Sequence, residues 1–150
     1  MGTGTRRTTR KTDGRPSQPL PRAPGVLVVE DDPDQQWRLA RMLTVDGSRV
    51  VATSSAEGAV ALLREWPADV VLLDDELGGT SGIDVARRIH ALRPRLPIVL
   101  MTSDGGAHVE RTAENAGVAA CLHKPFGREA LWGVLGTVRR AGRRSAGRVE

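Results

Sequence analysis

Five polar side chains stand at or just after the end of a short apolar run of this sequence. They are Glu30, Asp31, Asp74, Thr102 and Lys124. Carboxylates brought within a few ångströms of one another repel strongly unless a cation lies between them. A hard divalent cation with oxygen ligands, such as Mg²⁺, suits a site of this kind next to a phosphate. A carboxylate nucleophile, a metal, an ammonium group and a hydroxyl donor form a phosphoryl-transfer site, in which positioning and charge neutralisation supply the catalysis.

The apolar runs alternate with segments of helical periodicity, which predicts strands and helices in strict alternation. The strand runs are Val26–Val29, Arg49–Thr53, Val70–Leu73, Pro97–Met101 and Ala119–Leu122. Apolar strands that alternate with helices are typical of an α/β fold whose parallel sheet is covered on both faces. The C-terminal ends of such strands share one edge of the sheet. We therefore expect the polar side chains to converge there.

Each of these residues also has an ordinary structural explanation. An acidic residue at a strand end is more often a helix cap than a ligand, and Asp32 before Pro33 is typical of such a cap. A single threonine or lysine at a strand end is usually incidental. The prediction therefore depends on the whole set rather than on Asp74 alone.

The segments around these residues resemble the receiver domain of two-component response regulators. The matching segments run over Val26–Asp32, Leu72–Asp75, Gly79–Gly82, Pro97–Ser103 and His123–Phe126. The resemblance covers the chain from about Val26 to Arg139. It implies a doubly wound, flavodoxin-like (βα)5 fold with a five-stranded parallel sheet in the order 2-1-3-4-5.

The resemblance assigns a role to each acidic residue of the set. Asp74 resembles the phosphoacceptor of the family. Glu30 and Asp31 resemble the acidic pair that holds Mg²⁺ together with Asp74. Glu76 resembles the position whose backbone carbonyl joins the metal.

The remaining site residues resemble the groups that contact the phosphoryl group. Thr102 resembles the switch hydroxyl that turns toward the phosphoryl group, and Lys124 resembles the family's site lysine. Pro125 follows that lysine, and in the family a cis peptide bond typically precedes it. Such domains accept phosphate from the phosphohistidine of a sensor histidine kinase or a histidine phosphotransfer protein. They catalyse only their own phosphorylation and dephosphorylation.

The sequence departs from the family at the position three residues before the lysine. Cys121 stands where the family usually has Tyr or Phe. In the family, that ring moves inward when the threonine switches. Because Cys has no ring to move, coupling from Thr102 to the face made by the fourth helix and fifth strand is in question. Cys121 is also the only cysteine, which excludes an internal disulfide and fits a reducing compartment.

The loop after Asp74 contains further departures. Gly78 stands where proline is common, and we expect it to loosen the loop, which ends at Gly82. Asp75 and Glu76 add negative charge beside the phosphoacceptor. We expect this charge to alter the lifetime of the phosphoryl group, in a direction that the sequence does not determine.

The charge distribution predicts one domain between two basic ends. The net charge is +5 for residues 1–25 and +4 for residues 139–150, which leaves −5 on residues 26–138. We interpret residues 1–25 as a disordered basic arm, 26–139 as the receiver and 140–150 as a basic tail. An acidic domain argues against a DNA-reading face on the domain itself.

The sequence favours a cytoplasmic, single-domain response regulator that signals to a downstream protein target. At 150 residues the chain has no room for an attached output domain, and no apolar run could span a membrane. Two alternatives stay open. One is a degenerate receiver that acts as a docking module without chemistry. The other is weak nucleic-acid association through the Arg-rich ends.

Overall fold

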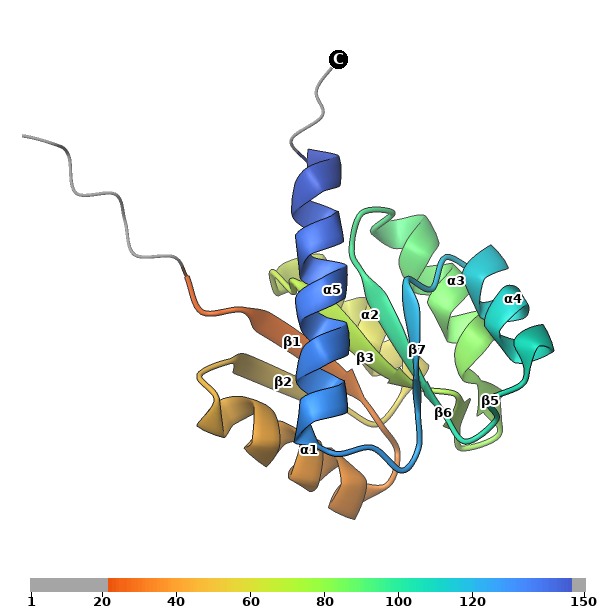
Figure 1. Ribbon diagram of the computed structural model, residues 1–150, viewed down its shortest axis with the longest axis horizontal. Coiled ribbons are helices and arrows are strands. Elements are labelled where there is room, and N and C mark those ends of the chain that lie inside the picture. The colour runs from red at the N-terminus through yellow and green to blue at the C-terminus, as the bar shows by residue number, and fades with distance from the viewer. Residues whose placement is uncertain (1–21, 147–150) are drawn as a thin grey trace, which may run out of the picture.

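The computed structural model describes residues 22–146, with side chains described as far as Gly142 (Figure 1). The elements along this part of the chain are β1 (Gly25–Val29), α1 (Pro33–Val45), β2 (Arg49–Thr53), α2 (Ala56–Glu65), β3 (Val70–Asp74), β4 (Glu76–Leu77), β5 (Thr80–Ser81), α3 (Gly82–Leu92), β6 (Ile98–Thr102), α4 (Ala107–Asn115), β7 (Ala120–His123) and α5 (Arg128–Ala146).

A parallel sheet with the strand order β2-β1-β3-β6-β7 forms the centre of the molecule. Because β6 and β7 are the fourth and fifth strands of this sheet, the predicted α/β fold and the order 2-1-3-4-5 are confirmed. Val29 of β1 pairs with Leu73 of β3. The register therefore brings the residues that follow, Glu30 and Asp74, to the same edge of the sheet.

Helices cover both faces of the sheet. Successive strand residues point to opposite faces, and in the buried strands both sets are apolar and need a covering layer. Val26 and Val28 of β1 pack with α1 and α5, whereas Leu27 and Val29 pack with α2, α3 and α4. Figure 1 shows α1 and α5 together in front of the strands, with the other helices behind or beside them. All five residues of β1, β3 and β6 are buried, which explains their continuous apolar runs.

A small antiparallel hairpin, β4 and β5, follows β3 and was not predicted from the sequence. Its two turn residues, Gly78 and Gly79, have φ values of +53° and +90°. Two successive residues with positive φ are typical of a tight hairpin turn, and glycine adopts this conformation without strain. The expectation that Gly78 loosens this loop stays a prediction.

The two ends of the domain differ from the predicted boundaries. β1 begins at Gly25, and α5 continues past Arg139 to Ala146, into the predicted tail. The predicted boundary followed the charge, but Arg and Ala are strong helix formers and no proline interrupts them. The predicted arm lies outside the described residues as far as residue 21, as do residues 147–150. No helix in the described part of the chain is long and apolar enough to cross a bilayer.

Candidate functional site

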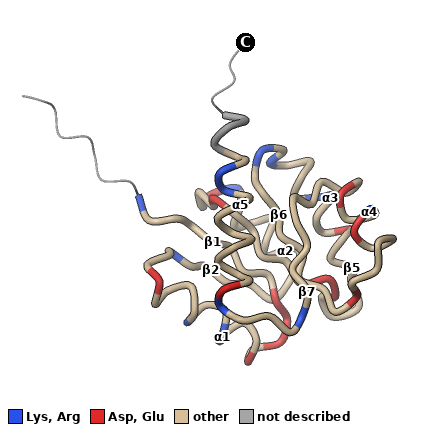
Figure 2. The backbone as a smooth tube through the Cα atoms, viewed as in Figure 1, with Lys and Arg blue, Asp and Glu red and all other residues tan. Residues whose placement is uncertain are grey.

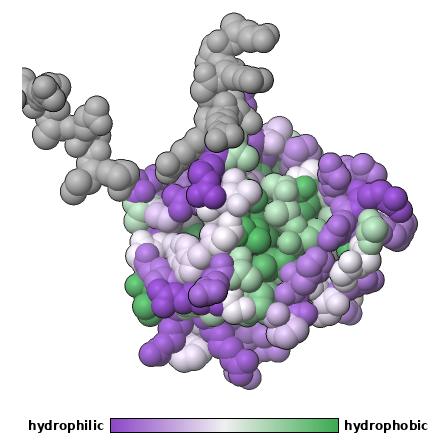
Figure 3. All heavy atoms as spheres, viewed as in Figure 1, coloured by the Kyte–Doolittle hydropathy of each residue, from purple (hydrophilic) through white to green (hydrophobic). Residues whose placement is uncertain are grey.

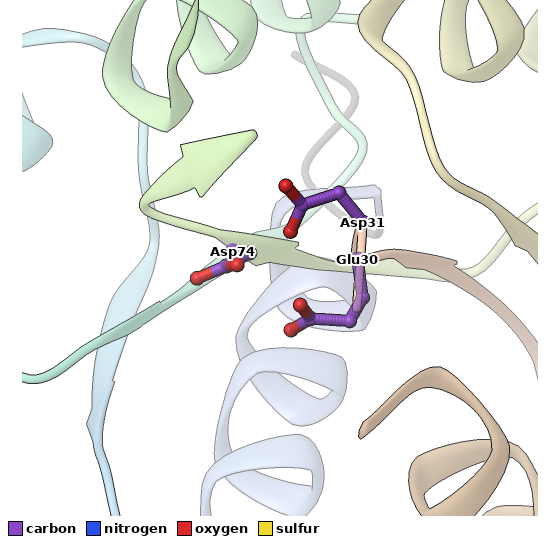
Figure 4. A group of neighbouring side chains, drawn as sticks. All are labelled: Glu30, Asp31 and Asp74. Carbon is purple, nitrogen blue, oxygen red and sulfur yellow. The ribbon is translucent and has the colours of Figure 1, made fainter. Parts of the chain in front are cut away.

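Three carboxylates meet at the C-terminal edge of the sheet. Glu30 and Asp31 follow β1, and Asp74 is the last residue of β3. One oxygen from each of the three carboxylates lies within 4.8 Å of the others. Figure 4 shows these three side chains directed toward a common space. Figure 2 shows acidic residues at this end of the molecule, with basic residues among them near α1 and at the end of β7.

Backbone and capping hydrogen bonds hold the acidic pair in place after β1. The N–H of Glu30 continues the sheet by donating to the carbonyl of Thr53, at 3.1 Å. Asp32 caps α1, because its side chain accepts the N–H of Asp34 at 2.9 Å. The pair is therefore held between a strand end and a capped helix start, as the Asp32-Pro33 signal predicted.

Lys124 supplies a positive charge between the carboxylates. It follows β7, and its backbone N–H donates to the carbonyl of Thr102 at 2.8 Å. Its Nζ donates to Oδ1 of Asp74 at 2.8 Å and lies 3.7 Å from Oε2 of Glu30. The parallel strands thus bring a lysine that follows β7 onto carboxylates at the ends of β1 and β3.

Burial and the neighbouring charges shift the pKa values of Glu30 and Lys124. Burial, with a smaller contribution from the charge of Asp74, raises the pKa of Glu30 to about 7, although the N–H of Asp32 opposes this. Burial lowers the pKa of Lys124, but its hydrogen bond to Asp74 and the surrounding carboxylates outweigh burial and raise it. A proton on Glu30 reduces the repulsion between its carboxylate and that of Asp74. A bound divalent cation would reduce this repulsion further.

The residues present fit a divalent metal. Oε2 of Glu30 is buried and has no hydrogen-bond partner among the described residues, which is costly for a polar atom unless a ligand completes it. Asp31 is exposed at the mouth of the site, and all three donors are carboxylate oxygens. Hard oxygen donors with one side open to water suit Mg²⁺, which retains several waters.

Thr102 lies at the same edge of the sheet, and in the described part of the chain its hydroxyl hydrogen-bonds to Asp75 and Asp104 rather than to Asp74. The residue ends β6 and is completely buried. Its Oγ1 donates to Oδ2 of Asp75 at 2.7 Å and accepts the N–H of Asp104 at 3.0 Å. Sequence reasoning missed the Asp75 partner, because a residue directly after the phosphoacceptor position on a strand is expected to point away from it.

A second contact that the sequence did not reveal joins Asp31 to the hairpin. The backbone N–H of Gly78 donates to Oδ2 of Asp31 at 2.8 Å. A proline at position 78 would have no N–H to donate. The glycine that stands in place of the family's common proline therefore anchors one of the acidic side chains.

Comparison with known proteins decides the family. The response regulator receiver domain family matches residues 26–135. The chain belongs to this family. Its sheet order is that of a receiver.

Two relatives place the receiver within longer proteins. The virulence sensor protein BvgS of Bordetella pertussis is 37% identical over 113 residues, which cover 71% of this chain and 9% of BvgS. The transcriptional regulatory protein TcrA of Mycobacterium tuberculosis is 32% identical over 137 residues, covering 90% of this chain and 54% of TcrA. The receiver therefore spans about half of one relative and a small part of the other.

Two solved structures share the fold of this receiver. A CheY-like receiver domain protein from Methanospirillum hungatei has a TM-score of 0.77 at 20% identity, covering 83% of this chain and 99% of that one. The Vibrio cholerae chemotaxis protein CheY4 has a TM-score of 0.75 at 21% identity, covering 78% and 99%. At these identities the likeness shows the fold alone.

The other predicted site residues surround the acidic cluster of the receiver. Glu76 begins β4 with an exposed side chain, and its metal-binding carbonyl stays a prediction. Gly82 begins α3 with its N–H donating to the carbonyl of Asp75, at 2.7 Å. The peptide bond between Lys124 and Pro125 is cis, as the resemblance implies.

Cys121 lies on β7, at the edge of the sheet and away from the acidic cluster. Its side chain is half-buried against the core beside α4, and burial, with a smaller contribution from the charge of Glu110, raises the pKa of its thiol. Figure 3 shows hydrophobic side chains over β7 and the neighbouring face of α5. That Cys121 takes the place of the family's movable ring stays a prediction, as does its role in switching.

Proposed function

We propose that this receiver takes a phosphoryl group onto Asp74 in a Mg²⁺-dependent reaction. The donor is the phosphohistidine of a sensor histidine kinase or a histidine phosphotransfer protein, and the reaction takes place in the cytoplasm. One observation supports the proposal above all. The carboxylates of Glu30, Asp31 and Asp74 meet within 4.8 Å, and Lys124 is 2.8 Å from Asp74.

The chemistry is a transfer between two covalent carriers. A carboxylate oxygen of Asp74 forms a bond to phosphorus as the phosphorus–nitrogen bond of the donor histidine breaks. The bonding electrons return to the imidazole nitrogen. Lys124 balances the charge on Asp74 and would face the transferred group, because its ammonium already lies on that carboxylate. Bound Mg²⁺ would neutralise the remaining negative charge of the carboxylates and the phosphoryl oxygens.

The proposal includes signalling by contact with a downstream protein. Every element between residues 22 and 146 belongs to the receiver fold, and the acidic edge is the part of the domain with chemistry. We infer that another protein reads the covalent state of Asp74.

Incubation with acetyl phosphate tests the proposal. With Mg²⁺ we expect intact-mass spectrometry to show a single added phosphoryl group, and we expect none after chelation by EDTA. Asp74→Asn should abolish the adduct because the amide is a poor nucleophile. Asp84→Asn removes an exposed carboxylate of α3 that pairs with Arg87, and it should leave the adduct intact.

Two results would contradict the proposal. One is the absence of an adduct on the unmodified protein under conditions that label another receiver, and this result would favour the docking alternative. The other is an adduct that survives Asp74→Asn, because it would place the phosphoryl group elsewhere.

A further inference from the structure

A fourth carboxylate, that of Asp75, accepts the hydrogen bond that the hydroxyl of Thr102 donates. The hydrogen bond from Oγ1 of Thr102 to Oδ2 of Asp75 is 2.7 Å long. The carbonyl of Asp104 is the other acceptor within reach, at 3.3 Å, and it is neutral. A hydroxyl has one proton to donate, and a charged acceptor at the shorter distance holds it more strongly.

The backbone of Asp75 is fixed on both sides. Its N–H donates to the carbonyl of Met101 at 2.9 Å, and its carbonyl accepts the N–H of Gly82 at 2.7 Å. One of these hydrogen bonds joins Asp75 to β6, and the other joins it to the start of α3. Together they fix the point from which the carboxylate reaches Thr102. The backbone of Asp75 therefore cannot follow a movement of Thr102.

Burial makes this hydrogen bond significant for Thr102. The threonine is completely buried, whereas the side chain of Asp75 is half-buried. A buried hydroxyl that loses its acceptor must find another, because water does not reach it. Thr102 therefore leaves Asp75 only when a second strong acceptor is offered.

We propose that Asp75 is a positioning residue that restrains Thr102 and thereby sets the cost of phosphorylation. A phosphoryl group on Asp74 must compete with Asp75 for the same hydroxyl proton. The inference rests on the proposed function for the identity of that competitor, although the restraint itself exists in the unphosphorylated protein. Removal of Asp75 should then favour the state in which Thr102 contacts the phosphoryl group.

Binding of beryllofluoride, a phosphoryl analogue, measures this competition in the presence of Mg²⁺. Fluorine NMR titrations give its dissociation constant for four proteins: unchanged, Asp75→Leu, Thr102→Val and the double variant. With Thr102 present, we expect Asp75→Leu to bind the analogue about tenfold more tightly, as for a lost hydrogen bond to a charged group. In the Thr102→Val background, the same change should have at least fivefold less effect, which is the coupling expected of one hydrogen bond.

This cycle separates the hydrogen bond from simple charge repulsion. Loss of the negative charge of Asp75 changes the dissociation constant by the same factor in both backgrounds. It therefore cancels when the effect of Asp75→Leu with Thr102 present is divided by its effect in the Thr102→Val background. Equal effects of Asp75→Leu in the two backgrounds would overturn the proposal. Asp75→Asn keeps an oxygen acceptor and should give an intermediate affinity. Asp84→Asn is the matched charge control and should change nothing.

A second readout needs no phosphoryl analogue. Three-bond NMR couplings of the Thr102 methyl carbon report the rotamer of its side chain. We expect a single rotamer in the unchanged protein and averaging in Asp75→Leu. Unchanged couplings would overturn the restraint. If no protein of the set binds beryllofluoride, the proposed function fails, while the couplings still decide the role of Asp75.

Discussion

Replacement of Gly82 by alanine is expected to lower the free energy of unfolding by about 3 kcal/mol, at the upper end for an overpacked core. A Cβ at this position would overlap the carbonyl oxygen of Asp74 and lie 2.7 Å from Cα of Asp75. Both are backbone atoms of β3 and its end, so neither can rotate away. Urea unfolding followed by circular dichroism measures the change. Because the strain falls on the backbone of Asp74, phosphoryl acceptance should decrease as well.

Gly133→Ala provides the matched control within a helix. Among the described residues, an added Cβ at Gly133 on α5 has no atom within 4 Å outside its own helix backbone. We expect this change to stabilise the protein by up to about 1 kcal/mol, because alanine is the better helix former. If Gly82→Ala were tolerated as well as Gly133→Ala, the close approach of α3 to the phosphoacceptor would be refuted.

Lys124→Met is expected to destabilise the metal-free protein by about 2 kcal/mol, because it leaves the carboxylates of Glu30 and Asp74 without their cation. This is less than for a fully buried pair, since the lysine side chain is 21% exposed. Glu30, with a pKa of about 7, also relieves part of the repulsion by taking up a proton near neutral pH. Urea unfolding in EDTA measures the loss, and saturating Mg²⁺ should reduce it.

The control for this change is a surface ion pair. Arg88 lies 3.6 Å from Glu57, and both side chains are more than half exposed. Arg88→Met should change stability by no more than about 0.5 kcal/mol. A loss in Lys124→Met that is the same with and without Mg²⁺ would show that Lys124 acts by packing, contrary to this account.

The position of the acidic cluster could be predicted because it follows from strand ends alone. Glu30 and Asp74 follow apolar runs, and the C-terminal ends of parallel strands share an edge whatever the detailed packing. The partner of Thr102 could not be predicted in this way. Its hydroxyl has more than one acceptor within reach, and the choice of Asp75 depends on rotamers that spacing does not encode.

The hairpin after β3 shows a different limit of sequence reasoning. Gly78 was compared with the proline common in the family, and the comparison suggested flexibility. The structure shows two glycines with positive φ in a tight turn and an N–H that anchors Asp31. The dipeptide Gly78-Gly79 between two short segments is itself a hairpin signal, and it could have identified this turn.

The most direct test of this account locates the phosphoryl group. Reduction of an aspartyl phosphate with borohydride converts the residue to homoserine, which peptide mass spectrometry detects at its position. After treatment with acetyl phosphate and Mg²⁺, we expect homoserine at position 74. Homoserine at position 31 or 75 instead, or at no position, would contradict Asp74 as the acceptor.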